Sequence, residues 1–318
     1  MKALRVNGNR LALEEIEIPH ILEESLVRLL FSGICNTDLE IVKGYAGFTG
    51  TIGHEFVGII ESSPDRPDLV GKRVVGEINA GCGTCDLCLA GDPRHCPTRT
   101  VLGIKGRDGA HAEYLMLPSR NLIVVPEEIS DRDAVFVEPF AAALGILEQV
   151  NFDGDPRVAV IGDGKLGLLC AIALSKRTGE VTLIGKHASK LNIAAERGIA
   201  TKLLSEVSDS TSFFDIVIEA SGSESGFETA LNIVRPRGKI VLKSTFSGKP
   251  TWEAWRVVVD EITIVGSRCG RFEPALEMMA SEHITFESLV TAEFPIDQAL
   301  AAIDKAREKG SLKVLLSF

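Results

Sequence analysis

The pattern of hydrophobic and polar positions changes along the chain. Up to about residue 128, short apolar runs are interrupted by polar positions and turn residues; the runs lie at 25–31, 56–60, 73–77 and 114–117. Runs of this length and spacing are typical of short β-strands. We therefore predict that the first part of the chain is a mostly β domain.

From residue 157 onward, the apolar runs have no polar alternation and are separated by helix-like segments. These runs lie at 158–161, 181–184, 216–220, 239–243 and 262–265. Strands without polar alternation, separated by helices, indicate a parallel sheet that is covered on both faces. The fold class is therefore predicted to be α/β, with a doubly wound parallel sheet in the second part of the chain.

The end of the chain adds two helix-like segments, 272–280 and 296–309, and one strand-like run, 313–316. These elements are too few for a third domain, so we expect them to return to the first one. The predicted division is 1–130 with 267–318 for the β-rich domain, and 131–266 for the α/β domain. A length of 318 residues agrees with two domains.

Charge and cysteine content narrow the function. The chain has 34 Lys and Arg against 44 Asp and Glu, which gives a net charge of -10, and it has no long basic run. Nucleic acid is therefore not an expected partner. The apolar stretches are shorter than the ~20 residues of a membrane span, and residues 1–6 do not resemble a secretory signal. We expect a cytoplasmic protein without membrane contact.

Four of the seven cysteines are clustered, at Cys82, Cys85, Cys88 and Cys96. A secreted disulfide scaffold would be shorter and more uniformly rich in cysteine. Closely spaced thiols on a loop that contains glycine can converge on one tetrahedral zinc ion. The cluster therefore predicts a structural zinc site.

A G-x-G-x-x-G motif follows the strand-like run 158–161 and opens a helix-like segment. Its glycines are Gly162, Gly164 and Gly167, with Lys165 and Leu166 between the last two. The glycines permit a tight turn, close approach of a pyrophosphate and close helix packing, and the helix N-terminus attracts the anion. This context predicts dinucleotide binding.

The next strand-like run suggests which nicotinamide cofactor is used. NAD sites usually place Asp or Glu at its end, to bind the adenosine ribose. Here the run ends at Gly185 and is followed by Lys186 and Lys190. A carboxylate would repel a 2′-phosphate, whereas a gap flanked by cations would accept it. We predict NADP(H) rather than NAD(H).

Three further residues follow later strand-like runs. They are Ser221, Ser244 and Arg268. Loops at the carboxyl ends of parallel strands face the ligand crevice, so these residues are candidate cofactor contacts.

Five motifs, in one order along essentially the whole chain, resemble those of the zinc-containing medium-chain alcohol, polyol and threonine dehydrogenases. They are Cys35-x-Thr37-Asp38, Gly53-His54-Glu55, the four-cysteine cluster, Val137-Glu138-Pro139 and the G-x-G-x-x-G. The resemblance implies a GroES-like β-rich catalytic domain, completed by the C-terminal segment, and a Rossmann coenzyme domain. It also implies that the four cysteines bind a structural zinc ion.

The same resemblance implies a second, catalytic zinc site. Cys35 and His54 would be ligands, Glu138 would lie near the metal, and Glu55 is the alternative carboxylate. Asp38 would orient His54. Three protein ligands leave one zinc position open, and the cation lowers the pKa of an alcohol there.

The expected proton relay begins at Thr37, two residues from Cys35. Many alcohol dehydrogenases carry a His at the position that corresponds to Glu40, as the outer end of this relay. Either Glu40 serves in its place, or the proton leaves by another route.

The leading hypothesis is a zinc-dependent oxidoreductase with two zinc ions per chain, which interconverts an alcohol or polyol and its carbonyl with NADP(H). The alternatives are a zinc-independent quinone or enone reductase of the same superfamily and a non-catalytic NADPH-binding sensor. The family forms dimers and tetramers, commonly by extending the Rossmann sheet, so a homo-oligomer is expected. Its partners would otherwise be small-molecule alcohols and carbonyls.

Overall fold

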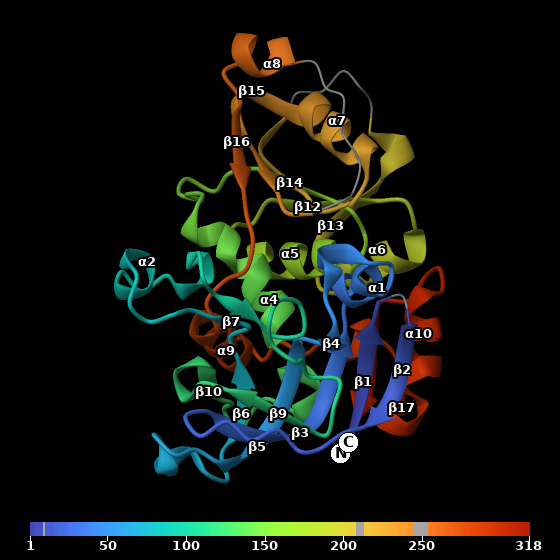
Figure 1. Cartoon of the computed structure of the whole chain (residues 1–318). Helices are drawn as coiled ribbons and strands as arrows, with labels where there is room; N and C mark the ends of the chain where they lie inside the picture. Colours follow the sequence, from blue (N-terminus) through green and yellow to red (C-terminus); the bar gives the residue numbers. More distant parts are fainter. Residues whose placement is uncertain (9, 208–212, 245–253) are drawn as a thin grey trace. The chain divides into compact units, whose positions relative to one another are not determined.

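The computed structural model describes residues 1–8, 10–207, 213–244 and 254–318, and it divides into two compact units. The first unit comprises Met1–Glu138 and Phe272–Phe318, and the second comprises Pro139–Arg271 (Figure 1). Each unit is built on a sheet of its own.

A seven-stranded sheet forms the centre of the first unit. Its strand order is β10, β6, β5, β3, β18, β17, and β9 also pairs with β3. The strands are β3 (Ser25–Ile34), β5 (Glu55–Ser62), β6 (Arg73–Gly76), β9 (Tyr114–Leu117), β10 (Leu122–Val124), β17 (Val290–Pro295) and β18 (Lys313–Ser317). Val27 and Leu29 lie on one face of β3 and are fully buried in a core with Phe56 and Leu115. Alternation of this kind follows from the two-residue period of a strand.

The C-terminal strand joins the end of the chain to the first unit. β18 pairs antiparallel with β3, with Val314 opposite Ile34, and parallel with β17. A smaller sheet has the order β2 (Arg10–Glu15), β1 (Lys2–Asn7), β4 (Gly50–Thr51). α10 (Ala299–Arg307) buries Ile303 in the core that these strands share with β18.

Residues 131–138 lie in the first unit, whereas the sequence division assigned them to the second, and residues 267–271 lie in the second unit rather than the first. α3 (Asp131–Ala134) begins at Ser130, whose Oγ accepts a hydrogen bond from the Asp133 N–H at 3.1 Å. The Phe286 N–H donates to Asp133 Oδ1 at 2.6 Å, and the rings of Phe136 and Phe286 stack with centroids 4.9 Å apart. These contacts with the returning C-terminal segment move the boundary to Glu138.

The second unit contains a six-stranded, all-parallel sheet with the order β13, β12, β11, β14, β15, β16. The strands are β11 (Val158–Ile161), β12 (Val181–Gly185), β13 (Ala200–Leu203), β14 (Phe214–Glu219), β15 (Val234–Leu242) and β16 (Thr263–Gly266). α5 (Lys165–Ser175) and α6 (Ala188–Ala195) lie on one side of this sheet and α7 (Glu224–Ile233) on the other (Figure 1). The predicted fold class is confirmed, because buried apolar strands require cover on both faces.

Two elements of this unit were missing from the sequence prediction. β13 has only half-buried or exposed residues, because it is an edge strand, so it lacks the apolar run by which the other strands were found. The short helix α8 (Ala254–Val259) exposes Trp255, Val258 and Val259.

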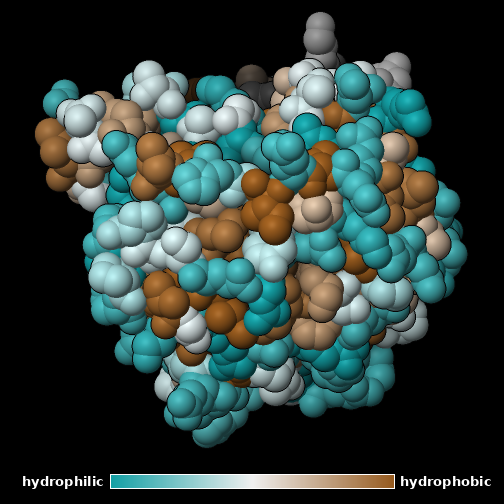
Figure 2. Space-filling model, turned by 60° about the horizontal axis from the view of Figure 1, so that its bottom comes forward, coloured by the Kyte–Doolittle hydropathy of each residue, from teal (hydrophilic) through white to brown (hydrophobic). Residues whose placement is uncertain are grey.

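The described residues form no helix that is both long and apolar enough to cross a membrane. On the face shown in Figure 2, hydrophobic residues form small groups that hydrophilic residues separate. Groups of this kind are ordinary on a protein surface and mark no particular partner.

Candidate active site

Three potential metal ligands converge in the first unit. Cys35 follows β3 and precedes α1 (Asn36–Val42), and His54 and Glu55 lie at the start of β5. β3 and β5 are antiparallel neighbours, with Gly33 opposite Glu55, which brings the end of one strand to the start of the other. One ligand atom from each of Cys35, His54 and Glu55 lies within 4.8 Å of the other two.

Asp38 holds these two segments together. Its Oδ2 accepts a hydrogen bond from the Cys35 N–H at 2.7 Å, and its Oδ1 accepts one from the Gly53 N–H at 3.2 Å. Asp38 Oδ1 also lies 3.4 Å from His54 Nδ1, and Oδ2 lies 3.5 Å from His111 Nε2. Burial opposes ionisation of Asp38, but the two histidines hold its pKa well below the usual range. The buried carboxylate therefore fixes the backbone at Cys35 and contacts the imidazole of His54.

Glu55 has one paired oxygen and one unpaired oxygen. Lys313 Nζ donates a hydrogen bond to Glu55 Oε2, and both side chains are 1% exposed. The other oxygen, Oε1, is buried without a hydrogen-bond partner. Burial alone would lower the pKa of Lys313, but Glu55 raises it above its usual value. An unpaired carboxylate oxygen beside a thiol and an imidazole fits a zinc ion.

Lys313 was not predicted from the sequence. It opens β18, where three apolar residues follow it, and its Nζ lies 5.6 Å from the centroid of the Phe136 ring. A charged residue at the start of a buried strand was the available signal. A Cβ at Gly33 would lie 2.5 Å from Glu55 Oε2, so a larger residue there would disturb the Glu55–Lys313 pair.

Glu138 is not a member of the convergent group. It lies in the first turn of α4 (Val137–Leu144) and is half-buried. Desolvation, together with the negative charges of Glu55 and Glu77, raises the pKa of Glu138 to about 7. The family resemblance implies Glu138 near the metal, with Glu55 as the alternative carboxylate, and the spacing of the ligand atoms favours Glu55.

Thr37 and Glu40 lie on α1 at different distances from the group. Thr37 Oγ1 lies 3.8 Å from Cys35 Sγ and its side chain is half-buried. Glu40 accepts a hydrogen bond from Lys43 Nζ at 2.8 Å, and 40% of its side chain is exposed. Thr37 is therefore beside the ligands, whereas Glu40 faces solvent.

The four clustered cysteines also converge. One sulfur atom from each of Cys82, Cys85, Cys88 and Cys96 lies within 4.8 Å of the other three. The Cys85 N–H donates to Cys82 Sγ at 3.4 Å, and the Cys82 N–H donates to Cys96 Sγ at 3.4 Å. Hydrogen bonds from Thr84 and Cys85 lower the pKa of Cys82 to about 5. A thiol that ionises readily among three others is suited to zinc.

In the second unit, the glycine motif joins β11 to α5 at the carboxyl edge of the sheet. Gly162 has φ +117°, and a Cβ at Gly167 would meet its carbonyl oxygen, so the turn and helix pack closely. Gly164 is the N-cap of α5 without a side-chain hydrogen bond, and a Cβ there would meet nothing within 4 Å. Open space before an uncapped helix N-terminus fits a pyrophosphate. Lys165 and Leu166 are the first two residues of α5.

Ser221 and Ser244 lie after β14 and β15 and are joined by a residue that the sequence analysis missed. Glu219 Oε1 accepts a hydrogen bond from Ser221 Oγ at 2.5 Å, and Glu219 Oε2 accepts one from Ser244 Oγ. Glu219 is 2% exposed. Its sequence signal was a single charge at the end of an apolar strand. Arg268 follows β16.

The space at the end of β12 is not the gap that the sequence analysis assumed. A Cβ at Gly185 would lie 2.6 Å from both Cβ and Oδ2 of Asp163, the second residue of the glycine motif. Asp163 Oδ2 accepts hydrogen bonds from the Lys186 N–H at 2.7 Å and the His187 N–H at 2.6 Å. Lys190 lies within the following helix, α6. A carboxylate therefore lies at this strand end, although it comes from another loop.

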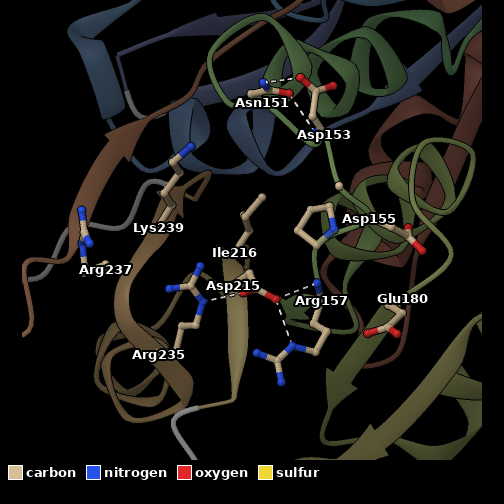
Figure 3. Close-up of a pocket in the computed structure, with 12 residues that line it drawn as sticks. Asn151, Asp153, Asp155, Arg157, Glu180, Asp215, Ile216, Arg235, Arg237 and Lys239 are labelled. Carbon is tan, nitrogen blue, oxygen red and sulfur yellow. Dashed lines mark hydrogen bonds and ion pairs between the residues drawn. The ribbon is translucent and has the colours of Figure 1, made fainter.

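A cavity of about 490 Å³ lies at the opposite, amino edge of the same sheet. Asp215 is one of its lining residues and lies between Arg157 and Arg235 (Figure 3). The Nε atoms of both arginines donate hydrogen bonds to the Asp215 carboxylate, and the distance from Arg157 Nε to Asp215 Oδ2 is 3.0 Å. Because these charges pair with one another, we assign the cluster a role in stability.

Comparisons with known proteins match both units. The family model "Alcohol dehydrogenase GroES-like domain" matches residues 22–127, and the model "Zinc-binding dehydrogenase" matches residues 166–281. Among curated relatives, the chain is 28% identical to an erythritol/L-threitol dehydrogenase from Mycolicibacterium smegmatis, over 96% of this chain and 93% of the relative.

Solved structures give the same result. A chain from Sinorhizobium meliloti 1021, bound to NADP, has a TM-score of 0.90 and 26% identity, with 100% of this chain and 99% of that chain covered. An alcohol dehydrogenase from Escherichia coli CFT073, in complex with NADH, has a TM-score of 0.92 and 28% identity, with the same coverage. These likenesses support an oxidoreductase. The chain therefore belongs to the zinc-type medium-chain dehydrogenase family.

Proposed function

We propose that the chain is a zinc-dependent dehydrogenase that interconverts an alcohol or polyol and its carbonyl with a nicotinamide dinucleotide. The convergence of Cys35, His54 and Glu55 carries this proposal. A thiolate, an imidazole and a carboxylate form a harder, more oxygen-rich donor set than two thiolates and an imidazole. The erythritol/L-threitol dehydrogenase among the relatives supports a polyol as the first substrate class to test.

Cys35, His54 and Glu55 would hold the catalytic zinc ion, and the unpaired Oε1 of Glu55 supports this assignment over Glu138. Cys82, Cys85, Cys88 and Cys96 would hold a second, structural ion. Zinc bound at the first site would supply a positive charge that lowers the pKa of an alcohol hydroxyl.

The chain's own residues would orient this site and move the proton. Asp38 fixes the Cys35 backbone and contacts His54, so it would keep the two ligands in place. The Thr37 hydroxyl, 3.8 Å from the Cys35 sulfur, would accept the proton that the alcohol releases. Glu40 is exposed on the same helix and would pass that proton to solvent.

The glycine motif, Ser221 and Ser244 would bind the dinucleotide at the carboxyl edge of the parallel sheet. Lys186 and Lys190 support NADP(H), which the sequence predicts, because cations favour a 2′-phosphate. Asp163 supports NAD(H), because its carboxylate lies at the ribose end of the site. Arg268 remains a candidate contact after β16.

A homo-oligomer, a dimer or tetramer, belongs to the same proposal. β16 is an edge strand of the parallel sheet, and an unpaired edge can pair with another chain. On α8, Trp255, Val258 and Val259 are 58%, 76% and 68% exposed, which supports a covering partner beside that edge.

Zinc content and hydride transfer test the function together. Elemental mass spectrometry should find about two zinc ions per chain, and His54→Ala should reduce this to about one. The unchanged chain should reduce NADP⁺ or NAD⁺ in the presence of a C4 or C5 polyol. One zinc ion with enone reduction would favour the zinc-independent reductase. Dinucleotide binding without any hydride transfer would favour the sensor.

A further inference from the structure

The ribose end of the dinucleotide site contains a carboxylate that the usual sequence position lacks. In NAD-binding Rossmann units, an acidic residue at the end of the second strand accepts hydrogen bonds from the ribose hydroxyls. This chain has Gly185 there, at the end of β12. The Asp163 side chain reaches across from the glycine motif, and its Cγ lies 2.8 Å from the point where a Gly185 Cβ would be.

Asp163 also makes the backbone contacts that fix this carboxylate. Its Oδ2 accepts hydrogen bonds from two consecutive N–H groups, those of Lys186 and His187, just before α6. The same oxygen lies 3.0 Å from His187 Nδ1. Partial burial raises the pKa of Asp163, but these hydrogen bonds hold it below the usual value. The side chain is therefore a fixed anion, and the residue is 8% exposed.

The second oxygen is less engaged than the first. Among the residues that the structure describes, Asp163 Oδ1 contacts the imidazole of His187, at 3.2 Å. A carboxylate oxygen has two lone pairs, so Oδ1 retains capacity to accept a hydrogen bond from a hydroxyl. A 2′-phosphate in the same place would meet a fixed negative charge. The N–H groups of Lys186 and His187, which could otherwise bind that phosphate, are already used by Oδ2.

The two lysines that favour NADP(H) are more exposed to solvent than the carboxylate of Asp163. Lys186 is exposed and Lys190 is half-buried on α6. Solvent and salt screen charges in such positions, whereas a buried carboxylate is screened much less. The nearby anion therefore outweighs the two cations.

We propose that Asp163 takes the place of the missing strand-end carboxylate, so that the ribose subsite accepts a 2′-hydroxyl and this chain prefers NAD(H) to NADP(H). The inference rests on the proposed dinucleotide site, and it identifies Asp163 as the residue that determines its specificity. Gly185 is part of the same arrangement, because any side chain there would collide with Asp163.

Direct binding of NADH and of NADPH to the unchanged, full-length chain tests this inference without turnover. Titration calorimetry should give a Kd for NADH that is about tenfold or more below that for NADPH. Asp163→Asn keeps an oxygen for the two N–H groups and removes the charge. It should tighten NADPH binding about tenfold and weaken NADH binding about threefold.

Two further variants control for folding and position. Asp155→Asn is a matched control, because Asp155 also accepts a backbone N–H, that of Gly179 at 2.8 Å, but at the amino edge of the sheet. It should leave both Kd values unchanged. The exchange Asp163→Gly with Gly185→Asp moves the carboxylate to the usual position and should keep the NADH preference. Thermal unfolding of each variant shows whether it is folded.

The possible outcomes separate the proposed role of Asp163 from the proposed dinucleotide site itself. Tighter binding of NADPH than NADH by the unchanged chain would overturn the role of Asp163 and leave the dehydrogenase proposal in place. A folded Asp163→Asn variant with the original ratio of Kd values would do the same, as would loss of NADH preference in the exchange variant. If neither dinucleotide binds the unchanged chain, the proposed dinucleotide site itself fails.

Discussion

The buried ion pair between Glu55 and Lys313 gives the sharpest test of the site. Lys313→Met removes the ammonium group and keeps most of the aliphatic volume, so the change creates little cavity. Both side chains are 1% exposed, and Glu55 Oε1 already has no hydrogen-bond partner. In the variant, Glu55 would be a buried carboxylate without its ion-pair partner.

The expected loss of stability depends on zinc. Removing one partner of a buried ion pair typically costs about 3–5 kcal/mol, because the other charge is left unpaired. We expect a loss of this size in the free energy of unfolding of the zinc-free protein. A zinc ion at Cys35, His54 and Glu55 would itself compensate Glu55, so the loss should fall below about 2 kcal/mol in the zinc-loaded protein.

Urea unfolding of both forms, followed by circular dichroism, measures these differences. The double variant Glu55→Gln with Lys313→Met is the control, because it removes both charges and should recover most of the loss. The reasoning is refuted if Lys313→Met costs less than about 1 kcal/mol in the zinc-free protein. It is also refuted if zinc makes no difference to the loss.

Three further predictions concern the cysteine cluster, the proton relay and the charged cluster in Figure 3. Cys88→Ser should lower the zinc content by about one ion per chain. Cys170 is fully buried and belongs to neither group of potential zinc ligands, so Cys170→Ser should leave the zinc content unchanged. Equal zinc content in the two variants would contradict a zinc site at the cysteine cluster. Thr37→Ala should lower kcat about a hundredfold with zinc retained, and Thr37→Ser should preserve most of the activity; an active alanine variant would remove Thr37 from the relay. Asp215→Asn should cost about 1–3 kcal/mol at pH 7, because it weakens the hydrogen bonds from Arg157 and Arg235. Burial opposes ionisation of Asp215, but the arginines hold its pKa well below the usual range. The contribution of Asp215 to the free energy of unfolding is therefore present above about pH 4 and is lost as the pH falls. If urea titrations give the same loss of stability for Asp215→Asn at pH 3 and at pH 7, this origin is contradicted.

The main outline of the fold was predictable from local patterns. The four buried, apolar residues of β11, followed by Gly162, Gly164 and Gly167, specify a strand, a turn and a helix within ten residues. The edge strand β13 was missed because its residues are exposed or half-buried and its short sequence has no apolar run. Residues 131–138 were assigned to the wrong unit because their partner, Phe286, is distant in the sequence.

By itself, the sequence determined the chemistry that lies within short segments. Cys35 and His54 were assigned as ligands only through the resemblance to a known family. The cysteine cluster, in contrast, spans only residues 82–96. Spacing and periodicity specify such features, because the chain between their members is short and its conformation is regular.

Only the tertiary structure shows which carboxylates lie beside the other residues of the two proposed sites. Glu55 rather than Glu138 converges with Cys35, and its partner Lys313 lies 258 residues away in the sequence. Asp163 fills the space at Gly185 because the glycine turn and the end of β12 meet at the same edge of the sheet. Contacts between segments depend on the packing of the whole unit, and no local pattern in either segment records them.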